Sequence, residues 1–122
     1  MDGRRENEPP GTVTDDARVE VRRDGRVVAR ADVSAPVEPH GTAKVAVRSH
    51  HGEPVPGARR DLVDQVLDHP GVRSSDDLHV VLPLGDSESI TRLQERTTGL
   101  QARAAGASSV VEAEVVPPGD EA

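Results

Sequence analysis

The sequence predicts a single α+β domain in which two helices pack on a mixed β-sheet of about five strands. Apolar and polar residues alternate in four short segments, which is the pattern of half-buried strands. Two other segments carry apolar residues at helical spacing. The elements follow one another as β-hairpin, β, α, β, α, β, and a mixed sheet with helices packed on it accommodates this order.

The length of 122 residues fits one domain, which we expect to span residues 17–116. Residues 1–16 are polar and contain two prolines, so we expect a disordered N-terminal arm, and we expect residues 117–122 to be a disordered tail. The domain begins with a hairpin from Arg18 to Val33. Asp24-Gly25 separates its two alternating runs, and this dipeptide is typical of a two-residue type I′ turn.

A third strand is expected over residues 43–48, followed by a loop rich in glycine and proline. A helix from about Ala58 to Asp68 follows Gly57 and is stopped by His69-Pro70, because proline cannot continue a helix. Apolar residues recur on one face of this helix and should point into the core. They are Ala58, Leu62, Val63, Val66 and Leu67.

Residues 78–84 are almost all apolar, which predicts a strand that is covered on both faces and ends near Pro83. Asp86 or Ser87 should cap a second helix that reaches Gly99, with a short further piece over residues 101–105. The last strand, over residues 110–116, alternates between valine or alanine and glutamate. We expect this strand to be half-buried, and it is a candidate for an exposed sheet edge.

The composition excludes several functions. The chain has no cysteine, so disulfides, thiolate metal sites and a cysteine nucleophile are impossible. The net charge of −7 opposes binding to nucleic acid or to an anionic membrane surface. No apolar N-terminal run resembles a signal peptide, which predicts a cytoplasmic protein. Lys44 is the only lysine among 15 basic residues, a bias that indicates a GC-rich and actinobacterial genome.

The order of elements resembles the second half of the GNAT (Gcn5-related) acyltransferase fold, over roughly residues 18–116. The resemblance includes the hairpin VRRDGRVVARADV, the segment GARRDLVDQVL, the strand that ends at Gly85-Asp86, and the helix with SITRLQER. In that family, the loop before the first of these helices binds the pyrophosphate of coenzyme A on backbone amides. The resemblance therefore implies coenzyme A or acyl-CoA as the cofactor. Its contacts would be His51, Gly52, Gly57 and Ala58, with Arg59 and Arg60 near the phosphates.

The same loop departs from the family pattern. Pro54 and Pro56 lack the backbone N–H that would bind an anion, and Glu53 adds a negative charge. The chain has no tyrosine to act as general acid. We therefore favour a small non-catalytic interaction or regulatory domain, as a monomer or homodimer with an unidentified protein partner. A degenerate acyl-CoA-binding or acyltransferase domain is the alternative.

Two further constellations are weaker. His50, His51 and Glu53, completed by His40 or His69, have the side chains of a metal site, although adjacent histidines in a loop are usually only polar loop residues. The element order also fits ribonuclease H-like folds, in which Glu20 and Asp86 would hold metal ions. The charge of −7 and the absence of aromatic residues argue against a nucleic-acid substrate.

Overall fold

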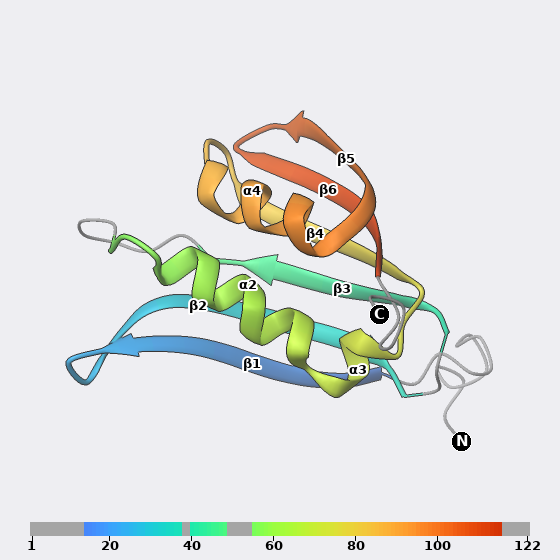
Figure 1. Ribbon diagram of the computed structural model, residues 1–122, viewed down its shortest axis with the longest axis horizontal. Coiled ribbons are helices and arrows are strands. Elements are labelled where there is room, and N and C mark those ends of the chain that lie inside the picture. Colours follow the sequence, from blue (N-terminus) through green and yellow to red (C-terminus); the bar gives the residue numbers. More distant parts are fainter. Residues whose placement is uncertain (1–13, 38–39, 49–54, 116–122) are drawn as a thin grey trace, which may run out of the picture.

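The computed structural model describes residues 14–37, 40–48 and 55–115 (Figure 1). The strands in this part of the chain are β1 (Thr14–Arg23), β2 (Arg26–Pro36), β3 (Thr42–Val47), β4 (Asp77–Pro83), β5 (Thr97–Ala105) and β6 (Ser108–Val115). The helices are α2 (Ala58–Asp68), α3 (Pro70–Arg73) and α4 (Ser87–Arg96).

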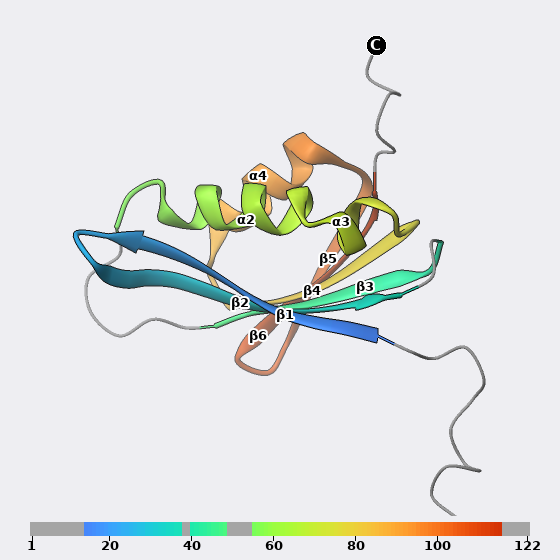
Figure 2. The ribbon, with the colours of Figure 1, turned by 90° about the horizontal axis from the view of Figure 1, so that it is seen from below.

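Within these described residues, six strands form one mixed sheet in the order β1-β2-β3-β4-β6-β5. Only β3 and β4 pair in parallel, and the other described neighbours are antiparallel. The predicted class, α+β with a mixed sheet, is therefore confirmed. The helices α2, α3 and α4 all lie on one face of this sheet (Figure 2). No helix in the described part of the chain is both long enough and apolar enough to cross a lipid bilayer.

The local signals in the sequence place several elements correctly. Asp24 and Gly25 both have positive φ angles, as a type I′ turn requires, and they join β1 to β2. The helix α2 has the predicted bounds, and the predicted apolar residues are its buried ones. Asp86 caps α4, since its side chain accepts a hydrogen bond from the backbone N–H of Ser89 at 3.2 Å.

The predicted continuation of α4 is wrong. The helix ends at Arg96, where the hydroxyl of Thr97 donates to the carbonyl of Leu93 at 2.6 Å, and residues 97–105 form the edge strand β5. Gly99 lies at an irregularity in the pairing with β6 and has a positive φ angle. Pairing with β6 provides the backbone hydrogen bonds of this strand. Its residues show no apolar periodicity from which a strand could be predicted.

Three other expectations also differ from the structure. The strand β6 lies inside the sheet, between β4 and β5, so it is not the exposed edge. The strand β1 begins at Thr14, within the segment assigned to the arm. No described element covers the second face of β4, where Val81 is 37% exposed. An apolar run therefore did not mean burial on both faces.

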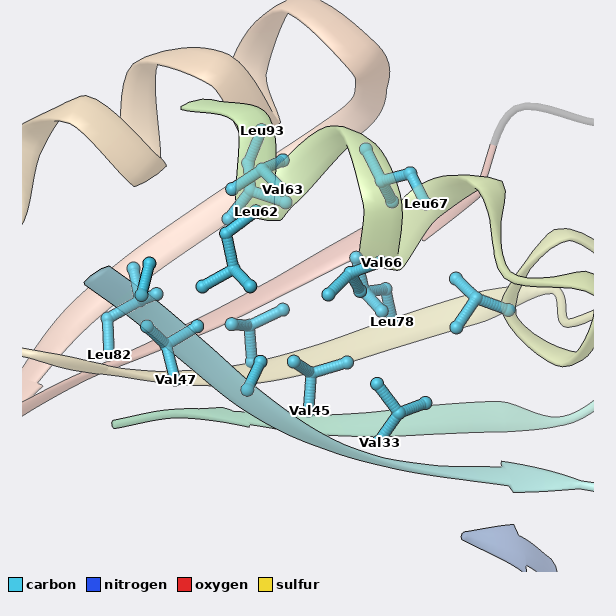
Figure 3. Close-up of a cluster of buried hydrophobic side chains, with 14 of the residues drawn as sticks. Val33, Val45, Val47, Leu62, Val63, Val66, Leu67, Leu78, Leu82 and Leu93 are labelled. Atoms are coloured by element: carbon cyan, nitrogen blue, oxygen red, sulfur yellow. The ribbon is translucent and has the colours of Figure 1, made fainter. Parts of the chain in front are cut away.

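The core lies between the three helices and the sheet. Its buried apolar residues in the described part of the chain are valine, alanine and leucine, and Leu62, Leu78, Leu82 and Leu93 are its largest fully buried side chains. Figure 3 shows Leu62 and Val66 pointing from α2 toward the strands that carry Val45, Val47 and Leu82. Because the core has no aromatic side chain, each of its leucines contributes a large share of the buried apolar area.

Candidate functional site

The candidate site lies where β3 and β4 stop pairing. Their parallel ladder joins Thr42–Ala46 to Asp77–Val81, and the strand residues beyond Ala46 and Val81 have no partner in it. Both α2 and α4 begin at this end of the sheet (Figure 1). A cavity of about 560 Å³ lies here. Its lining comes from β2, the start of α2 and the turn into α4, and includes Val28, Val55, Ala58, Arg59, Leu84, Asp86 and Glu88.

The start of α2 has the backbone geometry of an anion-binding site. Gly57 precedes the helix with a φ angle of 84°, a left-handed conformation that a residue with a side chain rarely adopts. No side chain from the helix itself caps these N–H groups. Unpaired N–H groups and the positive end of the helix dipole attract an anion at such a position.

In this protein, the side chain of Glu88 from α4 takes that position. Its Oε1 accepts hydrogen bonds from the backbone N–H of Arg59 at 2.9 Å and of Arg60 at 3.2 Å. Its Oε2 accepts one from the N–H of Gly57 at 3.2 Å. The N–H of Ala58 donates to the carbonyl of Val55 at 3.1 Å. The backbone donors from Gly57 to Arg60 are therefore all satisfied from within the chain.

The guanidinium of Arg59 is also engaged. It forms an ion pair with Asp86, whose side chain is only 7% exposed, and it donates to the carbonyl of Arg48 at 3.4 Å. Asp86 in turn accepts from the hydroxyl of Ser89 at 2.7 Å. Two helix N-termini and one arginine thus face two carboxylates, so the charges at this site largely cancel.

The structure brings together four of the residues predicted to contact the cofactor, namely Gly57, Ala58, Arg59 and Arg60. The N–H groups of Gly57, Arg59 and Arg60 already bind Glu88, and the N–H of Ala58 binds the carbonyl of Val55. The residues as arranged therefore do not fit a pyrophosphate group. No local sequence pattern indicates Glu88 as a site residue, because its contact joins two helices about thirty residues apart. The other two predicted residues, His51 and Gly52, lie outside the described residues.

The metal hypothesis gains no support. His50, His51 and Glu53 lie outside the described residues. Among the residues that are described, no group of three histidine or acidic side chains is placed to hold a metal ion. Glu20 and Asp86, the metal ligands of the ribonuclease H-like hypothesis, have different partners. Glu20 forms an ion pair with Arg22, whereas Asp86 forms an ion pair with Arg59 and accepts a hydrogen bond from Ser89.

An ion-pair network holds α2 and α4 together beside the site. The carboxylate of Asp64 in α2 accepts hydrogen bonds from Arg92 at 2.8 Å and from Arg96 at 2.7 Å, both in α4. Partial burial by itself would raise the pKa of the Asp64 carboxyl, but the bonds from Arg92 and Arg96 outweigh burial and lower it. The hydrogen bonds of Arg92 to Asp64 and to Glu95 raise the pKa of Arg92.

We expect Asp64→Asn to lower the free energy of unfolding at neutral pH by about 1–2 kcal/mol, since two charge-assisted hydrogen bonds weaken. A carboxyl whose pKa is lowered by folding stabilises the protein above its unfolded pKa of about 3.9, and this contribution is lost as the pH falls through the folded pKa. In urea unfolding at several pH values, the free energy of unfolding should therefore fall more steeply below about pH 4 for the wild type than for Asp64→Asn.

Asp68→Asn is the matched control, since Asp68 is 67% exposed and contacts only the rim of the network, through Arg96 at 3.2 Å. This variant should retain wild-type stability within about 0.5 kcal/mol. If the free energy of unfolding changes with pH in the same way for the wild type and for Asp64→Asn, the Asp64 carboxylate does not make the expected contribution to stability.

Comparison with known proteins supports the fold. No protein-family model matches the sequence, and no curated protein matches it significantly. Among solved structures, a protein described as an acetyltransferase from Sphaerobacter thermophilus aligns with a TM-score of 0.59 and 13% identity, over 97% of this chain and 74% of that chain. A ribosomal-protein-alanine N-acetyltransferase from Brucella melitensis aligns with a TM-score of 0.52 and 15% identity, over 80% of this chain and 67% of that chain.

A GNAT-family acetyltransferase from Streptococcus pneumoniae aligns with a TM-score of 0.46 and 10% identity, over 78% of this chain and 64% of that chain. The two alignments with TM-scores above 0.5 show that the domain has a GNAT-like fold, as the sequence resemblance indicated. At these identities the likeness concerns the fold alone, because one fold supports many functions.

Proposed function

We propose that this protein is a non-catalytic GNAT-like domain with an interaction or regulatory role, in which its own Glu88 carboxylate occupies the place of a bound anion. The observation that carries the proposal is the set of three backbone hydrogen bonds from Gly57, Arg59 and Arg60 to that carboxylate. A domain of this kind would act by binding a protein partner.

Electrostatics supports the same proposal. An incoming pyrophosphate would have to displace Glu88 from all three N–H groups and would then lie beside Asp86, which is almost fully buried. Arg59 cannot neutralise the added charge without leaving Asp86 unpaired. Removing the partner of a buried charge is strongly unfavourable, so coenzyme A would bind weakly or not at all.

The test is a titration with coenzyme A, followed by the backbone amide signals of Gly57, Ala58 and Arg59 in NMR spectra. We expect these signals to remain unchanged in the wild type up to roughly millimolar ligand, since the backbone donors from Gly57 to Arg60 are already hydrogen-bonded. Saturable shifts at lower concentrations would contradict the proposal. They would favour the alternative, a degenerate acyl-CoA-binding or acyltransferase domain.

The variant Glu88→Ala makes the test sharper. It should lower the stability by about 1 kcal/mol, as loss of an N-cap does, and should allow inorganic pyrophosphate to shift the same three amides. Glu95→Ala is the matched control, because it makes the same change in charge on α4 at an exposed residue whose carboxylate accepts a hydrogen bond from Arg92. If Glu88→Ala remains as unresponsive to pyrophosphate as Glu95→Ala, Glu88 is not what blocks anion binding.

A further inference from the structure

The sheet has one covered face and one open face. The helices α2, α3 and α4 pack on the first, and none of the described elements lies on the second (Figure 2). The open face carries a hollow of about 870 Å³ across β1 to β4, and Lys44, Ala46, His79 and Val81 contribute to its lining. An uncovered sheet face with an exposed apolar residue, Val81, at its centre is a candidate contact surface.

The centre of the open face is an apolar row. Ala46, Val81 and Val110 are direct cross-strand partners on β3, β4 and β6, so they lie next to one another across the sheet. Val81 is an exposed large apolar residue on the central strand, and the other two are half-buried. In Figure 2, none of α2, α3 and α4 lies on this face of the sheet.

The charges beside this row are arranged symmetrically with opposite signs. The neighbouring row of open-face residues has His79 on β4 at its centre. Lys44 on β3 is its partner on one side, and Glu112 on β6 is its partner on the other. At the ends of the apolar row, Asp32 on β2 pairs with Ala46, and Arg103 on β5 pairs with Val110. Lys44 and Glu112, each one strand from β4, therefore carry opposite charges, and so do Asp32 and Arg103, each two strands from β4.

We propose that a second copy of this chain packs face to face on the open face, with the two-fold axis running along β4. Aligned packing of two twisted sheets keeps their strands within about 30° of each other. The axis places Val81 against its own counterpart and places β3 of each copy over β6 of the other. Ala46 then contacts Val110, and Lys44 pairs with Glu112, each pair joining the two copies.

The same axis brings Arg103 of one copy toward Asp32 of the other. Asp32 already binds Arg48 at 2.8 Å and lies near Arg18, so it would become the centre of a larger ion-pair cluster. A two-fold contact repeats each of these pairs, so the match between acidic and basic positions counts twice. The net charge of −7 opposes association of two copies, which makes such specific pairing necessary.

The edges of the sheet are less suited to pairing. The edge strand β1 carries Asp15, Asp16, Arg18, Arg22 and Arg23, and charged side chains of this kind discourage edge-to-edge association. The other edge, β5, has irregular pairing at Gly99, which shortens the regular stretch available to another strand. The open face therefore remains the better contact surface. This inference is independent of whether the protein binds coenzyme A.

Sedimentation equilibrium of the full chain tests the proposal. We expect a monomer–dimer equilibrium at concentrations up to roughly 500 µM, since interfaces of modest size bind weakly. Val81→Arg should weaken dimerisation at least about tenfold, because it places two like charges together at the axis. Leu84→Arg is the matched control, since Leu84 is 55% exposed but lines the other cavity, and it should leave the equilibrium unchanged.

Charge reversal tests the register. Lys44→Glu and Glu112→Lys should each abolish dimerisation when present alone, because each creates two like-charge contacts. An equimolar mixture of the two variants should form heterodimers, since every reversed residue then meets an opposite charge. A wild type that is monomeric throughout the concentration range, a dimer insensitive to Val81→Arg, or a mixture that stays monomeric would each overturn the proposal.

Discussion

Replacing Leu62 by alanine should lower the free energy of unfolding by about 2–5 kcal/mol, the usual range for a leucine removed from a core. Leu62 is fully buried in α2 and points toward the sheet (Figure 3). The core around it contains valine, alanine and leucine only, and β-branched or small side chains cannot move far enough to fill the space. A cavity should therefore remain.

The expected loss is a large fraction of the stability of a small domain, which is typically about 5–15 kcal/mol. Urea unfolding monitored by circular dichroism measures it. Leu84→Ala is the control, because Leu84 is 55% exposed and should change the stability by less than about 0.5 kcal/mol. Equal and small losses for both variants would mean that Leu62 does not anchor α2 to the sheet.

Gly71→Ala should lower the free energy of unfolding by about 1–3 kcal/mol, as overpacking does in a tight contact. A Cβ atom at Gly71, in α3, would lie 2.7 Å from the Cβ of Ala35 on β2, well inside the normal contact distance. Both groups belong to rigid elements and neither side chain can rotate away. Either α3 or β2 must therefore shift.

A double-mutant cycle checks this steric explanation. Ala35→Gly removes the atom that clashes, so Gly71→Ala should cost less in the Ala35→Gly background than in the wild type. Strand glycine is itself unfavourable, which is why the coupling energy and not the absolute stability is the relevant measurement. A coupling energy near zero would show that Gly71 is needed for another reason.

Local signals in the sequence predicted the local features of the fold. Asp24-Gly25 predicted the hairpin, because few dipeptides tolerate two positive φ angles. Gly57 and Pro70 marked the bounds of α2, and Asp86 was recognised as a capping residue. Each of these predictions depends on residues that are neighbours in the chain, so the sequence contains the information needed.

The predictions that were wrong depended on contacts between distant segments. The residues from Gln101 to Ala105 are a strand because β6 pairs with them, not because of their own preference. The apolar run in β4 suggested burial on both faces, although only one face is covered by described elements. Burial depends on which segments pack together, and a periodic pattern does not report that.

The residues of the chain alone thus specified an aliphatic α+β domain and the position of its hairpin and first long helix, and the resemblance to the GNAT fold drew attention to the start of that helix. Whether that helix start is available to a ligand depended on the three-dimensional arrangement, because the acceptor, Glu88, comes from the next long helix. The N–H donors follow from local backbone geometry, whereas their partner follows from how α2 and α4 pack.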